Sequence, residues 1–234
     1  MFVCYLPLFH TFGRYLEMTG CVFWGATYCF ADSPSVEALS RQMRRLEATV
    51  FISIPMKWMQ LYDLIRQEVD VEADPDDAIS RAVRSVTGGG LRWGLSAAGY
   101  LDPDIFRFFQ RYGVELMSGF GMTEATGGIT MTPPGQYRDD SLGLPLPGIE
   151  IRITDADSGA SLADGETGMI EVRGPNVFKG YWRMPEKTAE EMTADGAVVI
   201  DVRDSASFGG FHIPGSINIG FEKQMANWVG MVVD

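Results

Sequence analysis

The chain has 234 residues and a mass of 25.8 kDa, enough for one large domain or for a domain with a small appendage. Its 31 Asp and Glu residues outnumber 19 Lys and Arg residues, which gives a formal net charge of −12 at pH 7. This charge argues against duplex nucleic acid as a partner, because phosphate binding depends on surplus basic side chains; a nucleotide needs only a few backbone donors and one metal site.

The apolar and cysteine patterns bear on location. The longest apolar run, residues 21–31, is about half of the roughly 20 residues that cross a bilayer. No basic leader followed by an apolar core opens the chain. Three cysteines, Cys4, Cys21 and Cys29, cannot all pair, which is more typical of a reducing compartment than of a disulfide scaffold. We therefore expect a cytoplasmic protein without a transmembrane segment.

Strand and helix patterns alternate through the first 120 residues. The Ser33-Pro34 pair is typical of a helix start, and Asp102-Pro103 marks another. The acidic stretch 70–77 is best interpreted as a solvated loop. Alternation of this kind predicts an α/β fold with a mostly parallel sheet and crossover helices. The predicted strands are 1–6, 26–30, 49–54, 91–96 and 114–117, and the predicted helices are 12–23, 33–46, 56–69 and 102–110.

The pattern changes after Gly148. Apolar residues alternate with polar ones over 149–153 and 170–172, with a turn-rich link between them, which predicts a two-stranded antiparallel ribbon. A short helix is expected over 185–192. Near residue 197 the pattern changes again, so we expect two domains, 1–196 and 197–234. The second is predicted to contain strands at 198–202 and after residue 212, then an amphipathic helix at 221–233.

A glycine-rich turn follows the strand predicted at 114–117. Its sequence over 118–124, Ser-Gly-Phe-Gly-Met-Thr-Glu, lets the backbone approach a ligand closely and exposes amides able to hold an anion. Thr123 offers a hydroxyl, Glu124 a hard oxygen of the kind that Mg²⁺ takes alongside phosphates, and Phe120 a flat face for a base. The residues alone fit a plain turn with a capping Thr and a surface Glu equally well.

Other motifs accompany this turn in a fixed order. Leu6-Pro-Leu-Phe-His10 and Gly94-Leu-Ser-Ala-Ala-Gly99 precede it, and Ser141-Leu-Gly-Leu-Pro-Leu-Pro-Gly148 follows it. Further on come Gly165-Glu-Thr-Gly-Met-Ile-Glu-Val-Arg-Gly174 and Phe178-Lys-Gly-Tyr181. In this combination, residues 1 to about 196 resemble the adenylate-forming superfamily of acyl-CoA synthetases, and look most like long- or medium-chain fatty acid ligases. The resemblance implies a partial core of the adenylate-forming ligase fold.

The resemblance also implies roles for individual residues. Phe120 would stack on adenine, Thr123 would contact phosphate, and Glu124 would hold Mg²⁺. His10 would lie at the acyl pocket, although a lone His beside a strand end is more often simply a packed residue. Gly174 and Gly180-Tyr181 match a largely structural motif. The implied catalytic residues are Thr123 and Glu124; the nucleotide-binding residues Gly119, Phe120, Gly121, Met122 and Thr123; and the acyl-pocket residues His10, Ser96, Ala97, Ala98 and Gly99.

The activity implied by the resemblance is an ATP-dependent acid–thiol ligation. A carboxylic acid, by resemblance a fatty acid, would react with ATP to give acyl-AMP and pyrophosphate, and the acyl group would then pass to coenzyme A. The implied cofactors and substrates are ATP/AMP, Mg²⁺ and coenzyme A. Because a carboxylate must approach a polyphosphate, the metal and oriented donors must neutralise the oxygens that gain charge.

Three elements expected of such a ligase have no match in this chain. They are the phosphate loop with its Lys, which would precede residue 1, the ribose-binding Asp in a Thr-Gly-Asp setting, and a small C-terminal domain with the catalytic Lys. Asp201 lies near the expected ribose position, but its neighbours do not match. We therefore expect the middle of an acyl-CoA ligase that is incomplete as a catalyst. A catalytically inactive nucleotide-binding or interaction fragment is the alternative.

Residues 197–234 resemble the opening of a rhodanese-type sulfurtransferase. The resemblance is carried by Val199-Ile-Asp-Val-Arg-Asp204, Phe208 and His212-Ile-Pro-Gly-Ser-Ile-Asn218. A persulfide carrier needs a cysteine thiolate, and no Cys follows Cys29. His212 is therefore better interpreted as a structural residue, and a sulfur-transfer or regulatory module is the weaker alternative for the tail.

We also expect the chain to self-associate. In a partial core, the strand predicted at 2–6 would lack at least one neighbour, and unpaired strand edges promote pairing with other chains. The apolar side chains of Phe23, Trp24, Trp58 and Trp228 are expected to lose cover as well. A peripheral contact with a membrane is left open.

Overall fold

The computed structural model describes residues 1–192, 196–201 and 217–218. The chain divides into two compact units. Unit 1 comprises Met1–Phe120 and Met131–Gly143, and unit 2 comprises Gly121–Thr130 and Leu144–Asp234.

Unit 1 contains a parallel sheet whose strands run in the order β2-β1-β3-β4-β5. The expectation that the opening strand lacks a neighbour is wrong, because β2 and β3 flank β1 on both sides. The edge strand is instead β2. The strands are β1 (Phe2–Cys4), β2 (Tyr28–Phe30), β3 (Val50–Ser53), β4 (Trp93–Ser96) and β5 (Glu115–Phe120).

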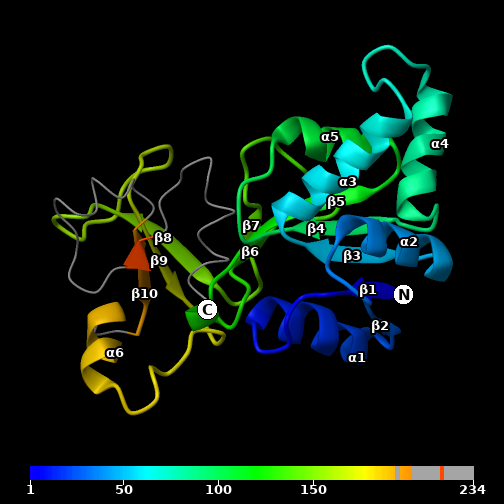
Figure 1. The fold of residues 1–234 in the computed structure, drawn as a ribbon. Helices are drawn as coiled ribbons and strands as arrows, with labels where there is room; N and C mark the ends of the chain where they lie inside the picture. Colours follow the sequence, from blue (N-terminus) through cyan, green and yellow to red (C-terminus); the bar gives the residue numbers. More distant parts are fainter. Residues whose placement is uncertain (193–195, 202–216, 219–234) are drawn as a thin grey trace. The chain divides into compact units, whose positions relative to one another are not determined.

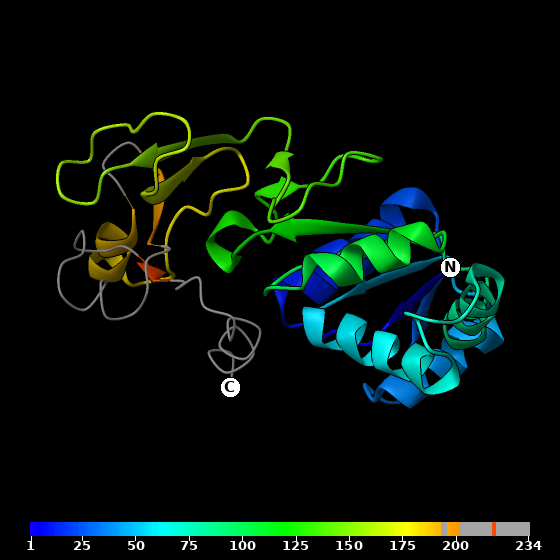
Figure 2. The ribbon, with the colours of Figure 1, turned by 90° about the horizontal axis from the view of Figure 1, so that it is seen from above.

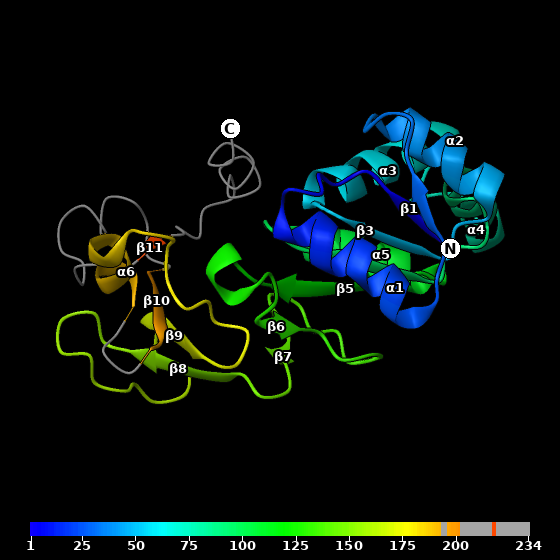
Figure 3. The same ribbon diagram turned by 90° about the horizontal axis from the view of Figure 1, so that it is seen from below.

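Helices cover the two faces of this sheet unequally (Figure 1). Helices α2 to α5 pack on one face, where Leu39, Trp58 and Phe109 are fully buried. Figures 2 and 3 show the two faces in turn, and the second is covered by the segment η1–α1. The helices are η1 (Phe12–Thr19, a π-helix), α1 (Gly20–Trp24), α2 (Val36–Leu46), α3 (Pro55–Glu68), α4 (Asp76–Thr87) and α5 (Pro103–Arg111).

Trp58 is the centre of the four-helix side. Its ring packs edge-on against Phe51 and Phe109, with centroid distances of 5.3 Å and 5.1 Å. Its indole nitrogen donates a hydrogen bond of 3.1 Å to the carbonyl of Leu95. A Cβ on Gly94 would lie 2.4 Å from the Trp58 ring, so glycine is what lets the indole lie against β4. The expectation that Trp58 loses its cover is wrong.

Local signals in the sequence set most helix starts, with two corrections. Asp102 caps α5 as expected, its side chain accepting from the backbone N–H of Asp104. Helix α2 begins at Val36 and is capped by Ser35 rather than Ser33, because the Ser35 hydroxyl accepts from the backbone of the first turn. The loop predicted over 70–77 ends earlier, because α4 starts at Asp76. The two carboxylates in its first turn stabilise the helix through their interaction with its dipole.

Unit 2 contains a four-stranded sheet in the order β11-β10-β9-β8. β8 (Glu150–Thr154) and β9 (Met169–Arg173) form the predicted antiparallel ribbon. β10 (Val198–Asp201) adds antiparallel to β9 and buries Val198 and Ile200, and β11 (Ile217–Asn218) pairs parallel with β10. The remaining elements of unit 2 are η2 (Thr123–Ala125), β7 (Leu144–Pro145) and α6 (Pro185–Glu191), and the two residues of β6 (Thr130–Met131) are divided between the units.

The α/β architecture with a mostly parallel sheet and an antiparallel ribbon is therefore confirmed. The helix predicted at 221–233 and the turn at His212 lie outside the described residues. Among the helices that the structure describes, none is long and apolar enough to cross a membrane.

Candidate functional site

Three serines lie side by side at the carboxyl ends of strands in unit 1. Ser53, Ser96 and Ser118 are paired in register across β3, β4 and β5, and all three are buried. The Ser53 hydroxyl bonds with the hydroxyl of Tyr5 at 2.7 Å, and the Ser118 hydroxyl donates to the carbonyl of Ser141 at 2.6 Å. The Ser96 hydroxyl between them has no hydrogen-bond partner in the described structure. Buried orphan hydroxyls are unusual, and ligands bind at this end of parallel strands.

The loop that follows Ser96 has an unusual backbone. Ala98 has a φ of 63°, in the left-handed region that non-glycine residues seldom adopt, and Gly99 has a φ of 158°. Ala97 and Ala98 are half-buried against the η1 side of the sheet. Strained backbone of this kind clusters at ligand sites. The loop of residues 96–99 thus combines a left-handed alanine with an orphan hydroxyl.

The glycine-rich turn starts at the end of β5. Gly119 and Phe120 complete that strand in unit 1, and the Phe120 side chain is only 9% exposed. Its ring is therefore largely packed within the protein. Gly119 and Phe120 directly follow Ser118, which is paired with Ser96 across β5 and β4. Part of the predicted nucleotide site and the start of the 96–99 loop therefore lie side by side in unit 1.

The rest of the turn belongs to unit 2 and is tightly closed. A Cβ on Gly121 would lie 1.8 Å from the carbonyl oxygen of Gly127, so only glycine fits there. The Gly127 N–H donates to the carbonyl of Met122 at 2.8 Å. Met122 is buried, whereas the side chain of Thr123 is exposed and that of Glu124 is half-buried. The two polar groups expected to meet phosphate and metal are thus presented by one short helical turn, η2.

Residues 176–181 hold this turn from the side. The Asn176 side-chain amide donates to the carbonyls of Ala125 and Gly128, at 2.9 Å and 2.6 Å. The Phe178 N–H donates to the carbonyl of Glu124 at 2.7 Å, and the Tyr181 hydroxyl donates to the Glu124 carboxylate at 2.6 Å. The sequence identifies Gly180-Tyr181 only as part of a largely structural motif. Asn176 and Tyr181 lie 48 to 57 residues along the chain from the groups that they bind, and no sequence signal identifies that pairing.

Glu124 is the residue whose chemistry fits a magnesium ion. One carboxylate oxygen accepts from Tyr181, and the other has no hydrogen-bond partner in the described structure. Within the same residues no group of three or more His, Cys, Asp or Glu side chains could hold a metal. A single carboxylate suits Mg²⁺ that takes its remaining ligands from phosphates and water, because Mg²⁺ is often bound in this way.

His10 has a local structural role. Its Nδ1 accepts a hydrogen bond of 3.1 Å from the backbone N–H of Phe12, next to the first turn of η1. The side chain is half-buried, and burial lowers its pKa below the ordinary value of 6.5. A neutral imidazole with an accepting Nδ1 caps a helix well. The structure gives His10 this contact and none to the 96–99 loop among the hydrogen bonds it describes.

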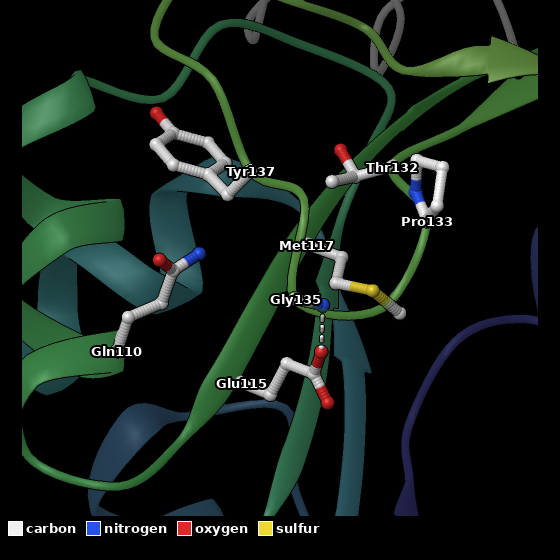
Figure 4. Close-up of a pocket in the computed structure, with 7 residues that line it drawn as sticks. All are labelled: Gln110, Glu115, Met117, Thr132, Pro133, Gly135 and Tyr137. Atoms are coloured by element: carbon white, nitrogen blue, oxygen red, sulfur yellow. Dashed lines mark hydrogen bonds between the residues drawn. The ribbon is translucent and has the colours of Figure 1, made fainter.

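A cavity of about 280 Å³ lies next to the serine row in unit 1, since the hydroxyl of its lining residue Thr132 is 2.9 Å from that of Ser118 (Figure 4). Two of its lining residues are joined by a hydrogen bond, in which the Glu115 carboxylate accepts from the N–H of Gly135 at 2.6 Å. It contains none of the residues predicted for the site, so we do not assign it to the nucleotide or the acyl chain. The cavity is lined by Gln110, Glu115, Met117, Thr132, Pro133, Gly135 and Tyr137.

Comparison with known proteins gives two family matches. Residues 1–182 match the model of the family described as AMP-binding enzyme, and residues 184–231 match that of the Rhodanese-like domain. These matches confirm the resemblance of the chain to adenylate-forming enzymes and, in its last part, to rhodaneses.

Curated relatives are CoA ligases of greater length. Long-chain-fatty-acid–CoA ligase 6 of Homo sapiens is 28% identical over 220 residues, covering 83% of this chain and 31% of the relative. The 4-coumarate–CoA ligase-like 4 protein of Oryza sativa subsp. japonica is 29% identical over 198 residues, covering 83% and 33%. The chain thus spans about a third of the length of the curated relatives it matches.

Solved structures show the same relation. ATP-bound MatB from Rhodopseudomonas palustris matches with a TM-score of 0.69 and 31% identity, over 85% of this chain and 36% of that one. A malonyl-CoA ligase with methylmalonyl-CoA and AMP bound matches with a TM-score of 0.66 and 28% identity, over 84% and 39%. The chain therefore corresponds to part of an adenylate-forming ligase core.

Proposed function

The chain belongs to the AMP-binding enzyme family, and we propose that it forms part of an ATP-dependent acid–thiol ligase that makes acyl-AMP and passes the acyl group to coenzyme A. One observation carries this proposal: the closed turn that presents Thr123 and Glu124. Gly121 permits its close approach to Gly127, and residues 176–181 fix its backbone and its carboxylate. A plain surface turn needs no such support.

The roles follow from charge. A carboxylate and a triphosphate repel each other, so their approach requires donors and a cation at the oxygens that gain charge. We propose that the exposed Thr123 hydroxyl donates to a phosphate oxygen and that the Glu124 carboxylate holds Mg²⁺, which would neutralise phosphate charge when bound. Gly119 to Met122 would line the nucleotide, and Phe120 would contact adenine with the small part of its ring that is exposed.

The loop of residues 96–99 is proposed to contact the substrate. Its orphan Ser96 hydroxyl would gain its missing partner from a bound polar group, and the left-handed Ala98 is the kind of strain that a ligand site retains. We assign the acyl pocket to this loop and, less directly, to His10. A fatty acid is the proposed substrate because several curated relatives are named as long-chain-fatty-acid ligases.

Calorimetry on the whole chain tests this function. We expect weak ATP binding that strengthens when Mg²⁺ is added, and we expect Glu124→Ala to remove the strengthening. Glu150→Ala, an exposed carboxylate on β8 of the same unit, is the matched control and should keep it. Equal ATP affinity with and without Mg²⁺ in the unaltered chain would contradict the role of Glu124. Absence of ATP binding under any condition would favour the alternative of an inactive interaction module.

For the organisation of the chain we propose a ligase part over 1–196 and a short rhodanese-like segment over 197–234. The family match to residues 184–231 supports the second, and a sulfur-transfer or regulatory role is the weaker reading of it.

Partners and location complete the proposal. We propose self-association through the apolar surface of η1, α1 and the edge strand β2, with peripheral membrane contact as the competing use of that surface. A cytoplasmic location is proposed because Cys4, Cys21 and Cys29 are free thiols. Sedimentation with and without lipid vesicles separates the two uses.

A further inference from the structure

Glu124 is held at two points by one neighbouring segment. The Phe178 N–H fixes its carbonyl at 2.7 Å, and the Tyr181 phenol fixes one carboxylate oxygen at 2.6 Å. The side chain is half-buried, so the contact is partly shielded from water. A glutamate otherwise has three rotatable side-chain bonds, and ordering them costs conformational entropy. A hydrogen bond to a charged carboxylate is strong enough to offset much of that cost.

Tyr181 is itself held in place. Its N–H donates to the Thr188 hydroxyl at 2.9 Å, and its ring meets that of Phe178 edge-on at a centroid distance of 4.8 Å. The Lys187 ammonium lies 4.6 Å from the centre of the ring. The ring contacts with Phe178 and Lys187 thus orient the phenol whose hydroxyl donates to Glu124. Packing alone would not require the Tyr181 hydroxyl to be directed at the Glu124 carboxylate.

We propose that Tyr181 is a positioning residue for the metal-holding carboxylate of Glu124: its hydroxyl occupies one oxygen and leaves the other presented to a divalent cation. The inference rests on the proposed function, since it assigns Glu124 to the metal. Partners that orient a metal ligand commonly contribute 10- to 100-fold in metal affinity. A Tyr that served packing alone would lose nothing at the metal on conversion to Phe.

The test is an NMR titration of the ¹⁵N-labelled whole chain with Mn²⁺ alone, a paramagnetic ion that broadens the signals of nearby amides. Mn²⁺ bound at Glu124 broadens the amide signals of Thr123 and Ala125, and the concentration that gives half of this broadening reports affinity. Tyr181→Phe removes the hydroxyl and keeps the ring. Tyr112→Phe is the matched control, because that hydroxyl also donates to a carboxylate, Asp76, at 2.8 Å in unit 1. Glu124→Gln removes the proposed ligand itself.

We expect Tyr181→Phe to raise the half-broadening concentration about tenfold with an unchanged unfolding temperature. Tyr112→Phe should leave it unchanged, and Glu124→Gln should abolish the local broadening. A Tyr181→Phe chain that titrates like the unaltered one would overturn the positioning role, as would the absence of broadening at Thr123 and Ala125 in every chain. The proposed function is judged separately, by whether ATP binds the chain, so the two can fail independently.

Discussion

The Tyr28 phenol and the Glu17 carboxylate are hydrogen-bond partners inside unit 1, with 3.5 Å between the two oxygens. Glu17 lies on η1, is fully buried, and its other carboxylate oxygen has no partner in the described structure. Burial raises the pKa of Glu17 from 4.5 to about 8, and the same burial raises the pKa of Cys4 and of Cys21 beside it. A carboxyl group is thus kept protonated by its apolar surroundings at neutral pH.

This arrangement predicts a pH-dependent stability. Because the pKa is higher in the folded chain, folding takes up a proton between pH 4.5 and about 8, and the free energy of unfolding falls as the pH rises through that window. Glu17→Gln should remove the fall and stabilise the chain at pH 8 by an amount on the order of a few kcal/mol. Urea unfolding at pH 5, 6.5 and 8 measures it. Tyr28→Phe, which leaves Glu17 buried, should keep the slope, and an equal slope in Glu17→Gln would refute the argument.

Gly94 predicts a steric cost in the core. A methyl group there would lie 2.4 Å from the Trp58 ring, which has Phe51 and Phe109 on its other sides and cannot retreat. Gly94→Ala should lower the free energy of unfolding by about 1–3 kcal/mol through overpacking. Urea unfolding of Gly94→Ala in a Trp58→Phe background checks this. Because the phenyl ring is smaller, Gly94→Ala should lower the free energy of unfolding much less in that background. Equal effects of Gly94→Ala in both backgrounds would mean that the clash is not with Trp58.

Many helices and strands could be predicted because the residues that indicate them are consecutive in the sequence. Pro55 and Asp102-Pro103 mark helix starts, and apolar alternation marks β8 and β9. The acidic run at residues 70–77 predicts a loop rather than the start of α4, although Asp76 and Asp77 in a first turn favour a helix. The place of β2 at the sheet edge depends on pairing over some 25 residues, which periodicity does not encode.

In the candidate site, too, only the features carried by consecutive residues could be predicted from the sequence. Thr123 and Glu124 could be proposed from one run of residues, and their roles stay predictions. The Ser53–Ser96–Ser118 row depends on strand register, and the bond from Tyr181 to Glu124 joins residues 57 apart. Hydrogen bonds across such separations are decided by tertiary packing. They require a structure.

The isolated chain should not form acyl adenylate at a useful rate. Positioning of phosphates, ribose and carboxylate supplies much of the acceleration in such a reaction. The sequence carries no match to the phosphate loop, the Thr-Gly-Asp aspartate or the C-terminal lysine of the family it resembles. The assay is fatty-acid-dependent exchange of labelled pyrophosphate into ATP, with a full-length ligase as the positive control. Exchange clearly above background would show that this chain needs none of the three.

The rhodanese-like segment should lack thiosulfate:cyanide sulfurtransferase activity. Persulfide transfer needs a thiolate, and all three cysteines precede the matched residues 184–231. Of the three, Cys4 and Cys21 are buried with raised pKa, which further lowers their reactivity. Thiocyanate release from the whole chain should match a blank. Release that persists when the three cysteines are changed to Ser would show that another group carries the sulfur.

The last prediction concerns self-association of the whole chain. Strand β2 has a described neighbour on one side only, and Phe30 on it is 69% exposed. On α1, Phe23 and Trp24 are 80% and 63% exposed and pack against each other. Three aromatic side chains that bury on the order of 150–250 Å² each approach the size of patches that mark interfaces. Trp228, expected to add to them, lies outside the described residues.

Salt should increase this association. The charge of −12 keeps chains apart, but salt screens that repulsion beyond roughly 8 Å at physiological ionic strength, whereas apolar and strand contacts act at contact. Size-exclusion chromatography with light scattering at low and high salt should show a larger species that grows with salt. Phe30→Lys should shift it toward monomer by placing a charge on the strand edge. Trp182→Ser removes an aromatic residue of unit 2 that is 84% exposed, and should change little. A sharp monomer near 26 kDa at both salt concentrations would mean that the edge of β2 does not template pairing at all.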